Sequence, residues 1–431
     1  MKVWLVTVGE PLPVDGEDVR LYRTGLMSKM MVDRGHEVLW WTSSFDHIAK
    51  KQRCDNDKKC IIQPGLDLFM LHAPSYQANI SVDRLINHFG LGRKFCQLAR
   101  HESKPDIILV SFPTLKLAWE VVKYANGNNI PVVVDVRDLW PDIFLDLLPS
   151  WGRWLGRLPL FPLYKWTKLA CAGATGIAGV TPDFVEWGLK YAGRAIGPFD
   201  RDFPLGYSNR QPGAAQLLAA EQQWAAKGIT SHKGIFDICF FGTFGNQLDI
   251  ETVVEAAKIL EQDDVRKFRF IICGMGDKFE YYKSMVTKTK NIIFPGWVSA
   301  PEIWWLMRSA KVGLAPYKST PDYEMSIPNK IIEYLSAGLP IVTSLHGRTE
   351  KILVANSCGK VYTKGNPQDL ATILREMYDN SSGLSAMAHS ANKVFTEKFV
   401  AEKVYSDYID HLEYILETCR AQADSNKQKR R

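Results

Sequence analysis

Two kinds of segment alternate along nearly the whole chain. Short, almost continuous apolar runs are typical of buried parallel strands, and longer segments with apolar residues every three or four positions are typical of helices. In the first half the predicted helices cover residues 20–34, 82–100 and 114–125, and the predicted strands read KVWLVTV, EVLWWTS, LDLFMLH, DIILVSF, PVVVDVR and GIAGV. This alternation predicts an α/β fold built on a parallel sheet.

The alternation stops once and then restarts. Residues 201–213 are rich in Pro, Gly and polar residues, which indicates a linker. Beyond it come a helix over residues 248–260 and the strands FDICFFG, FRFIICG, NIIFPG, KVGLAPY, LPIVTS and GKVYT. We therefore predict two similar doubly wound domains, residues 1–200 and 214–395. In such sheets ligands lie at the carboxyl ends of the strands, which places the chemistry in a cleft between the two halves.

The C-terminal region differs from both halves. Residues 396–419 show helical periodicity, and we expect a helix that packs back on the N-terminal domain. The net charge of the chain is +6. Much of it lies in residues 420–431, which contain five basic residues and one acidic residue, Asp424. We expect this segment to be a disordered basic tail. Because the charge is not spread over a folded face, a nucleic-acid partner is disfavoured.

Composition excludes several classes of protein. Hydrophobic residues make up 46% and charged residues 23%, which is ordinary for a globular chain, and no apolar run reaches the length that spans a bilayer. The apolar run at the start is too short for a secretion signal. The eight cysteines are scattered, and Cys54 and Cys60, the closest pair, lack the spacing of a zinc site. We expect a cytoplasmic protein without disulfides or bound metal.

The segment YEMSIPNKIIEYLSAGLPIV, residues 323–342, carries the clearest chemistry. Pro328 and Gly338 bracket a short helix, and Lys330 and Glu333 lie one turn apart on the face opposite its apolar residues. A carboxylate accepts hydrogen bonds from two ribose hydroxyls, and a lysine neutralises a diphosphate. This face therefore suits a nucleotide sugar. The alternative is a surface Lys–Glu pair worth a few tenths of a kcal/mol.

Three further strand ends in the second half are candidates for ligand contact. FFGTFG contains Gly242 and Gly245, which allow a ligand to approach the backbone closely, and ICGMGD follows the next strand. A bare tight turn explains such glycines equally well. PGWV places Trp297 at a third strand end, where it would either stack on a base or belong to the core.

The first half offers two candidate groups. The loop after the first strand holds Gly9, Glu10 and Gly16, and Arg20 and Arg23 follow on a helix, where they would either face a diphosphate or form a solvated helix end. The segment PVVVDVRDLWPDIF delivers Asp135, Arg137, Asp138 and Trp140 to a strand end. Arg137 or Asp138 would lie beside the reacting group, and a buried Arg–Asp ion pair is the alternative.

Residues 151–168, WGRWLGRLPLFPLYKWTK, have the composition of an interfacial membrane anchor, with Trp and basic residues and no acid. Two prolines argue against a single deep helix. A core helix with basic ends is the alternative. The expected membrane contacts are Trp151, Arg153, Trp154, Arg157, Lys165 and Trp166.

The strings SIPNKIIEYLSAGLPIV and VRDLWPD resemble motifs of the family-4 glycosyltransferases, retaining enzymes of the GT-B fold, and most closely the bacterial subgroup of O-antigen and capsule synthesis. The resemblance implies that Glu333 binds ribose and Lys330 a diphosphate, with Lys330, Arg137 and Asp138 as catalytic residues. Met325 stands where many members have a first glutamate. The other implied donor-binding residues are Gly242, Thr243, Phe244, Gly274, Gly276, Asp277, Trp297, Val298, Ser326, Ile327, Pro328 and Asn329.

The resemblance also implies a reaction. The expected enzyme moves a sugar, an amino or deoxy hexose, from a UDP-linked donor to a polyprenyl-linked saccharide, with retention and without a metal or other cofactor. It would lie on the inner face of the membrane. A nucleotide-sugar 2-epimerase of the same architecture and a non-catalytic glycan-binding scaffold remain alternatives. An oxidoreductase is disfavoured, because no complete G-x-G-x-x-G follows the first strand.

Overall fold

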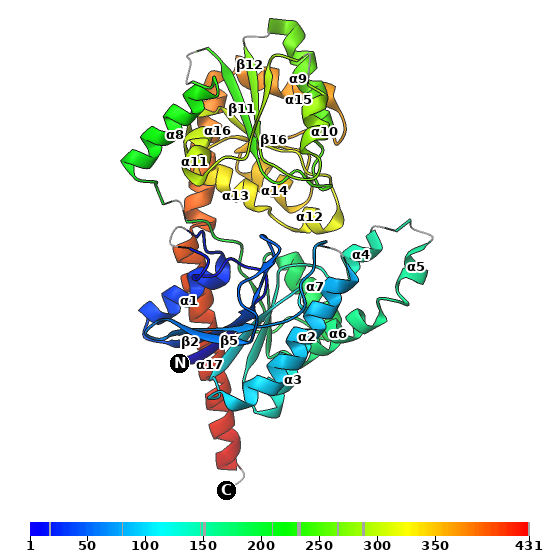
Figure 1. Cartoon of the computed structure of the whole chain (residues 1–431), viewed down its shortest axis with the longest axis vertical. Coiled ribbons are helices and arrows are strands. Elements are labelled where there is room, and N and C mark those ends of the chain that lie inside the picture. Colours follow the sequence, from blue (N-terminus) through cyan, green and yellow to red (C-terminus); the bar gives the residue numbers. More distant parts are fainter. Residues whose placement is uncertain are drawn as a thin grey trace. The chain divides into compact units, whose positions relative to one another are not determined.

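The computed structural model describes residues 1–16, 19–79, 81–146, 148–149, 152–208, 210–230, 234–264, 267–286 and 289–429. The chain forms two compact units. Unit 1 comprises Met1–Gly206 and Ala401–Arg431, and unit 2 comprises Tyr207–Val400. The C-terminal helix therefore belongs to unit 1, although unit 2 precedes it in the sequence (Figure 1).

Within the described residues, the main sheet of unit 1 has eight strands in the order β10-β9-β8-β7-β1-β2-β6-β5. All neighbours are parallel except β5, which pairs antiparallel with β6. The strands are β1 (Lys2–Val6), β2 (Glu37–Ser43), β5 (Lys58–Gln63), β6 (Leu66–Leu71), β7 (Ile107–Ser111), β8 (Val132–Val136), β9 (Gly176–Gly179) and β10 (Arg201–Asp202). A separate hairpin pairs β3 (Phe45–Asp46) with β4 (Lys51–Gln52). The order reverses between β1 and β7, which is where doubly wound sheets bind ligands.

Helices cover both faces of this sheet (Figure 1). The helices of unit 1 are α1 (Arg23–Asp33), α2 (Val82–Leu98), η1 (Ala99–His101), α3 (Leu115–Gly127), α4 (Asp142–Asp146), α5 (Arg153–Gly156), α6 (Phe161–Gly173), α7 (Pro182–Ala192) and α17 (Ala401–Lys429). Helices α1 and α17 pack together, and α2, α3, α6 and α7 contact one another in series. Successive residues of β1 point to opposite faces: Leu5 joins the core under α1 and α17, and Trp4 packs on Phe95 of α2.

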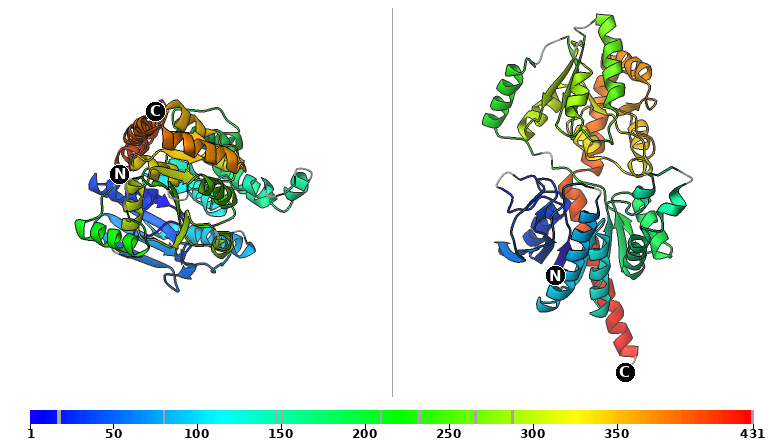
Figure 2. Two further views of the ribbon diagram at one scale, coloured as in Figure 1. Left: turned by 90° about the horizontal axis from the view of Figure 1, so that it is seen from above. Right: turned by 45° about the vertical axis from the view of Figure 1, so that its right-hand side comes forward.

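Helix α17 completes the core of unit 1. Leu412 is fully buried, and the ring of Tyr408 stacks on Phe203 with centroids 3.9 Å apart. The last turns run beyond the sheet, as the red helix in Figure 2 shows. The expectation of a disordered tail from residue 420 is wrong for the described residues, because α17 continues to Lys429 and Arg420 pairs with Asp106. The packed turns before residue 420 provide a template on which further turns add at little cost.

Unit 2 is a second parallel sheet, with the order β13-β12-β11-β14-β15-β16 among the described residues. Its strands are β11 (Phe236–Phe241), β12 (Phe268–Cys273), β13 (Ile292–Gly296), β14 (Val312–Ala315), β15 (Ile341–Thr343) and β16 (Gly359–Val361). Its helices are α8 (Ala214–Ala226), α9 (Ile250–Asp264), α10 (Phe279–Ser284), α11 (Ala300–Ser309), α12 (Pro321–Met325), α13 (Asn329–Ser336), α14 (Arg348–Ala355), α15 (Pro367–Asp379) and α16 (Ser381–Lys398). Here the order reverses between β11 and β14.

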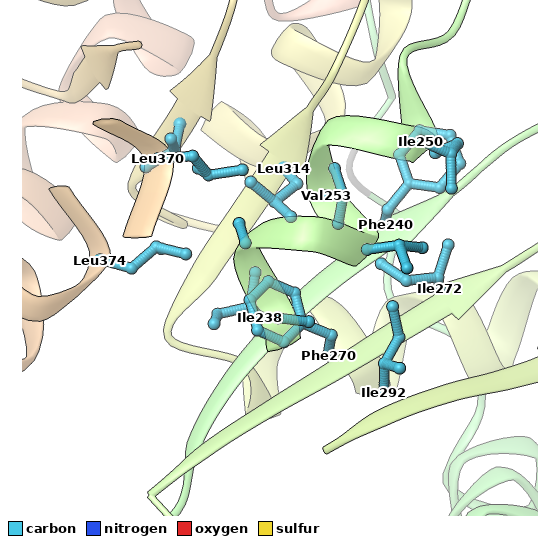
Figure 3. Packing of buried hydrophobic residues seen from close by; sticks show 14 of the residues in the cluster. Ile238, Phe240, Ile250, Val253, Phe270, Ile272, Ile292, Leu314, Leu370 and Leu374 are labelled. Carbon is cyan, nitrogen blue, oxygen red and sulfur yellow. The ribbon is translucent and has the colours of Figure 1, made fainter. Parts of the chain in front are cut away.

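The core of unit 2 lies between the sheet and helices α9 and α15. Figure 3 shows Ile238 and Phe240 of β11 packed with Val253 of α9, and Leu370 of α15 belongs to the same buried cluster. Alternate residues point the other way: Phe241 contacts Tyr334 of α13 with ring centroids 5.4 Å apart. Helix α13 is therefore held on the opposite face of the sheet from α9.

No helix within the described residues combines the length and apolar character needed to cross a bilayer. The predicted strands of both halves are present. Strand β5 was not predicted, because its Lys, Cys and Gln residues are half-exposed or exposed at the sheet edge and do not form a continuous apolar run.

Replacing Leu412 by alanine tests the role of α17. The cavity left beneath the helix is expected to lower the free energy of unfolding of unit 1 by about 2–5 kcal/mol. Glu417→Ala, on the exposed side of the same helix, should change it by less than about 0.5 kcal/mol. Urea unfolding followed by circular dichroism measures both, and equal stabilities of the two variants would contradict the packing of α17 on unit 1.

Candidate functional site

The charged side of α13 lies beside the end of β11. Lys330 Nζ donates to Glu333 Oε2 at 3.0 Å and lies 4.2 Å from the centroid of the Phe241 ring. Only 3% of Glu333 is exposed, and 18% of the Lys330 side chain. The alternative of a solvated surface pair is therefore wrong. The pair lies at the point where the strand order of unit 2 reverses, within reach of the carboxyl end of its central strand.

The sequence of α13 determines which side faces this position. Ile331, Ile332 and Leu335 are buried in the unit. Tyr334 is fully buried, and its hydroxyl donates to the carbonyl of Leu314 in β14 at 2.9 Å. The helix ends at Ser336, and the chain turns away at Gly338, whose φ of +65° favours glycine. With the apolar side held against β14 and β15, the charged side turns toward β11.

The glycines after β11 and β12 allow two loops to touch. A Cβ on Gly274 would lie 1.8 Å from the carbonyl oxygen of Gly242, and one on Gly276 would lie 2.6 Å from that of Phe244. Both glycines also have φ values above +140°. Their role in the structure is thus loop–loop packing, with the backbone of one strand end pressed against the next.

Several predicted donor-site residues are placed less favourably. Phe244 is fully buried among Phe240 and Phe279, so its side chain belongs to the core and does not line a ligand site. Thr243 and Asp277 are exposed. Val298 is buried, whereas 71% of Trp297 is exposed, and the alternative of a core tryptophan is wrong.

The loop before α13 is tied to its own unit. Ser326 and Ile327 are half-buried, Pro328 is buried and Asn329 is exposed. Glu324, next to the position of the missing glutamate, accepts a hydrogen bond from Ser319. The carboxylate of Glu324 is thus held within its own loop.

Sequence reasoning missed two aromatic residues at this site. Phe241 ends β11 and lies under Lys330. Tyr317 follows β14 and stacks on Tyr323 at 4.9 Å, and burial, then Tyr323 and Glu333, raise the pKa of its hydroxyl. The available signal was their position directly at or after a strand end, where a side chain faces the ligand side of the sheet.

In unit 1 the strand ends hold a buried charge network. Asp135, the second-last residue of β8, accepts from Arg23 at 3.0 Å and from Arg137 Nε at 2.6 Å. Arg137 also pairs with Glu10, which accepts from the Thr24 hydroxyl at 2.8 Å. Burial by itself would raise the pKa of Asp135, but Arg137 and Arg23 hold it below its usual value. Two cations and two carboxylates balance within one cluster.

This network corrects the prediction for Arg23. Its side chain is 1% exposed, and besides Asp135 its guanidinium donates to the carbonyls of Phe203 and Pro204. It therefore does not face a diphosphate. Asp135, near the carboxyl end of β8, is the carboxylate that pairs with the Arg23 guanidinium. Arg20 is exposed, with its guanidinium 6.0 Å from the Tyr22 ring centroid.

The remaining residues predicted in unit 1 differ in their surroundings. Arg137 forms the ion pair that was the alternative to a place beside the sugar, with 14% of its side chain exposed. Asp138 is half-buried and interacts electrostatically with Arg84. Gly9, with φ of +90°, packs near His47, and Gly16 is exposed.

The predicted membrane segment forms α5 and the start of α6. Trp151 lies outside the described residues. Trp154 is 67% exposed and Phe161 66%, so the alternative of a core helix is wrong for this stretch. Arg153 pairs with Asp146 at 3.3 Å, and Arg157 and Lys165 are exposed.

Exposed apolar residues continue from this segment onto α2. Trp166 of α6 is half-buried, and its ring lies 6.4 Å from that of Phe89 of α2. Val82 and Ile86 are exposed on the same helix as Phe89, one turn apart. In the part of the chain that the structure describes, no group of three or more His, Cys, Asp or Glu side chains is arranged to hold a metal ion.

Comparison with known proteins adds a family match for one unit. Residues 235–380, within unit 2, match the family model for glycosyl transferases group 1. The amylovoran biosynthesis glycosyltransferase AmsK of Erwinia amylovora is 25% identical over 164 residues, which cover 37% of this chain and 40% of that relative. TuaH of Bacillus subtilis is 25% identical over 32% of this chain and 34% of its own length. The chain thus spans well under half the length of these relatives.

Solved structures resemble nearly the whole chain. Sucrose-phosphate synthase from Thermosynechococcus elongatus has a TM-score of 0.70 at 15% identity and covers 97% of this chain and 99% of its own. HepE of Anabaena, solved in complex with UDP-glucose, has a TM-score of 0.65 at 16% identity, covering 96% and 100%. Likeness at such low identity establishes the fold alone. The predicted fold class, α/β of the GT-B type with two Rossmann-like domains, is confirmed.

Replacing Asp135 by asparagine tests the charge network of unit 1. Because Arg23 and Arg137 would lose their common carboxylate, we expect the free energy of unfolding to fall by about 3–5 kcal/mol at pH 7. The folded-state pKa of Asp135 lies below that of an unfolded aspartate, about 3.9, so its stabilising effect is complete above that value and is lost as the pH falls further.

The difference in stability between Asp135→Asn and the wild type should therefore narrow below about pH 4. Chemical unfolding measured from pH 7 to pH 3 checks this. Asp410→Asn is the matched control, because Asp410 pairs with Arg34 at the surface, where such pairs contribute no more than about 1 kcal/mol. Equal losses in the two variants would contradict a buried network.

Proposed function

We propose that the protein is a glycosyltransferase whose unit 2 binds a nucleoside-diphosphate sugar, and that it acts in the synthesis of a cell-surface polysaccharide. One observation carries the proposal. The largely buried Lys330–Glu333 pair lies beside the end of β11, at the reversal of strand order, and within the residues that match the glycosyltransferase family model. The biosynthetic name of the relative AmsK supports the pathway class.

The chemistry follows from where charge develops. Breaking the bond between sugar and diphosphate leaves negative charge on the diphosphate, and an ammonium group in a partly desolvated position stabilises it. Lys330 supplies that group. Glu333 accepts hydrogen bonds from the two ribose hydroxyls and, before the donor binds, holds Lys330 in place at 3.0 Å.

The base is proposed to be uracil. HepE, which shares the fold, was solved with UDP-glucose, and this supports a UDP-linked donor. Trp297 follows β13 and exposes most of its ring, so it offers a flat apolar face on which a base can stack. The identity of the sugar as an amino or deoxy hexose, and retention at the anomeric carbon, rest on the resemblance of SIPNKIIEYLSAG alone. Same-face attack assisted by the leaving phosphate is proposed because a double displacement would need a carboxylate nucleophile beside the sugar, and the sequence identifies none.

The acceptor is proposed to be a lipid-linked saccharide, reached from the inner face of a membrane. The exposed Trp154 and Phe161, with Arg157 and Lys165 near them, have the composition of a surface that enters the headgroup region. A peripheral enzyme of this kind would meet its acceptor at the bilayer surface.

Replacing Lys330 by alanine tests the donor site. We expect kcat/KM with a UDP-sugar donor to fall by about 10²-fold or more, equivalent to about 2.7 kcal/mol, because the leaving diphosphate loses its cation. Steady-state kinetics measures the change. Lys258→Ala is the control, since Lys258 and Glu255 form an exposed pair of the same spacing. Near wild-type kinetics for Lys330→Ala would remove Lys330 from the mechanism.

Membrane contact is tested by replacing Trp154 and Phe161 together by serine. Losing two large apolar side chains should weaken binding to vesicles of phosphatidylglycerol and phosphatidylcholine by at least about tenfold in co-sedimentation. Ile61→Ser is the control, because Ile61 is 80% exposed on β5 of the same unit. If the double variant sediments as the wild type does, α5 and α6 do not form the contact.

A further inference from the structure

A cluster of basic side chains in unit 1 is used by none of the sites above. Lys50 and His47 lie in the turn between β3 and β4, and Arg84 lies in the first turns of α2. Lys50 Nζ is 5.0 Å and Arg84 Cζ 5.8 Å from the centroid of the Tyr76 ring. His47 Nδ1 is 2.7 Å from the Tyr76 hydroxyl and 3.5 Å from Lys50 Nζ. All three basic residues are half-buried.

The permanent charges of this cluster are not paired. Within the described residues, no carboxylate lies within ion-pair distance of Lys50 or Arg84. Lys50 donates to the side chain of Asn79 and contacts His47, and Arg84 donates to the carbonyl of Asn79. Arg84 Nε is buried without a hydrogen-bond partner in the described structure. The nearest acid of the hairpin, Asp46, already accepts two backbone amides and pairs with Arg53 at 3.2 Å.

The pKa values of the three basic residues are all lowered, as expected for a cluster of positive charge without a neighbouring anion. Burial, then Arg84 and Lys50, lower the pKa of His47 to about 4, and only Asp46 opposes them. Burial, then Arg84, lower the pKa of Lys50. The pKa of Arg84 is lowered by burial, against Tyr76 and Asp138. Buried His88 of α2, which also faces Arg84, has a pKa near 3 and stays neutral at pH 7. Lys50 and Arg84 therefore remain as two cations, and the acids that act on them, Asp46 and Asp138, lie beyond ion-pair distance.

The position of the cluster favours a ligand. It lies among segments that follow the carboxyl ends of β1, β2, β6 and β8: Gly9 packs on His47, and Arg84 lies 4.5 Å from the ring of Trp140. Ligands of doubly wound sheets bind at this edge. A neutral imidazole keeps one N–H donor, and His47 lies 3.5 Å from Lys50 Nζ, so it adds a donor beside the two cations.

We propose that Lys50, Arg84 and His47 bind a phosphate or diphosphate group of the acceptor substrate. Two permanent cations match a doubly charged group better than a single carboxylate. The identification of the group with an acceptor rests on the proposed function. Of the two arginines predicted to face such a group, Arg20 is exposed and Arg23 is paired with Asp135 inside unit 1. The cluster of Lys50, Arg84 and His47 lies at the same edge of the sheet.

Calorimetric titration of the full chain with sodium pyrophosphate and with farnesyl diphosphate tests the proposal. Every protein in the series carries Lys330→Ala, which weakens binding of the probe at the donor site. Lys50→Gln and Arg84→Gln are each expected to weaken binding at least about tenfold. Lys104→Gln, an exposed residue with the same loss of charge, should change it less than about twofold. Lys50→Gln is decisive if Arg84→Gln fails to fold.

A second readout is the pKa of His47, followed by NMR of its ring protons. Pyrophosphate should raise it above about 4, because a bound anion stabilises the imidazolium. Tighter binding of farnesyl diphosphate assigns the group to a lipid-linked acceptor, and equal binding assigns it to a soluble phosphate; both support the site. Equal affinities in all variants, or dependence on Lys50 and Arg84 only for phosphatidylglycerol vesicles, would overturn it.

Failure here is distinguishable from failure of the proposed function. UDP binding to the wild-type chain is measured in the same series, and its absence would remove the donor site of unit 2 without changing the pyrophosphate titrations. UDP binding together with unchanged pyrophosphate affinity in Lys50→Gln would remove only the acceptor-phosphate site.

Discussion

Unit 1 depends on one carboxylate placed between two guanidinium groups. Asp135 is the second-last residue of β8, Arg23 begins α1, Arg137 follows β8, and Glu10 comes from the loop after β1. Arg23 also bonds the backbone at Phe203, which α17 covers through Tyr408. Segments distant in the sequence are thus joined by a cluster of zero net charge. Removing one member would leave a buried charge without its partner, which costs far more than an exposed pair contributes.

The loops at the carboxyl ends of the strands are held together by different interactions in the two units. In unit 2 the strand ends are brought together by backbone contact at Gly274 and Gly242, with no side chains between them. No charged side chain is needed to join these two loops, and the Lys330–Glu333 pair remains beside the end of β11. In unit 1 the ion pairs at the strand ends are internal. Lys50 and Arg84, on the β3–β4 turn and α2, hydrogen-bond Asn79 and have no carboxylate within ion-pair distance among the described residues.

Much of the fold was predictable, because a strand buried on both faces must be apolar along its length and a helix on a sheet must be apolar on one side. The same logic predicted the charged side of α13. It failed at Arg23 and Phe244, which were predicted to face a ligand. In the folded chain Arg23 pairs with Asp135, and Phe244 packs in the core of unit 2. It also failed for β5 and for the end of α17, because the half-exposed and exposed residues of β5 and the exposed residues 421–425 carry no burial pattern.

The amino-acid sequence alone determined the two doubly wound sheets and the pairing of Lys330 with Glu333 on one helix face, since both depend on local periodicity. Only the tertiary structure decided which charged side chains form ion pairs inside the protein and which do not. Arg23 and Arg84 each lie in the first turns of a helix after a loop, yet one lies within bonding distance of Asp135 and the other has no carboxylate within ion-pair distance in the described chain. Partners such as Arg23 and Asp135, 112 residues apart, are set by the packing of whole elements, and no local pattern contains that information.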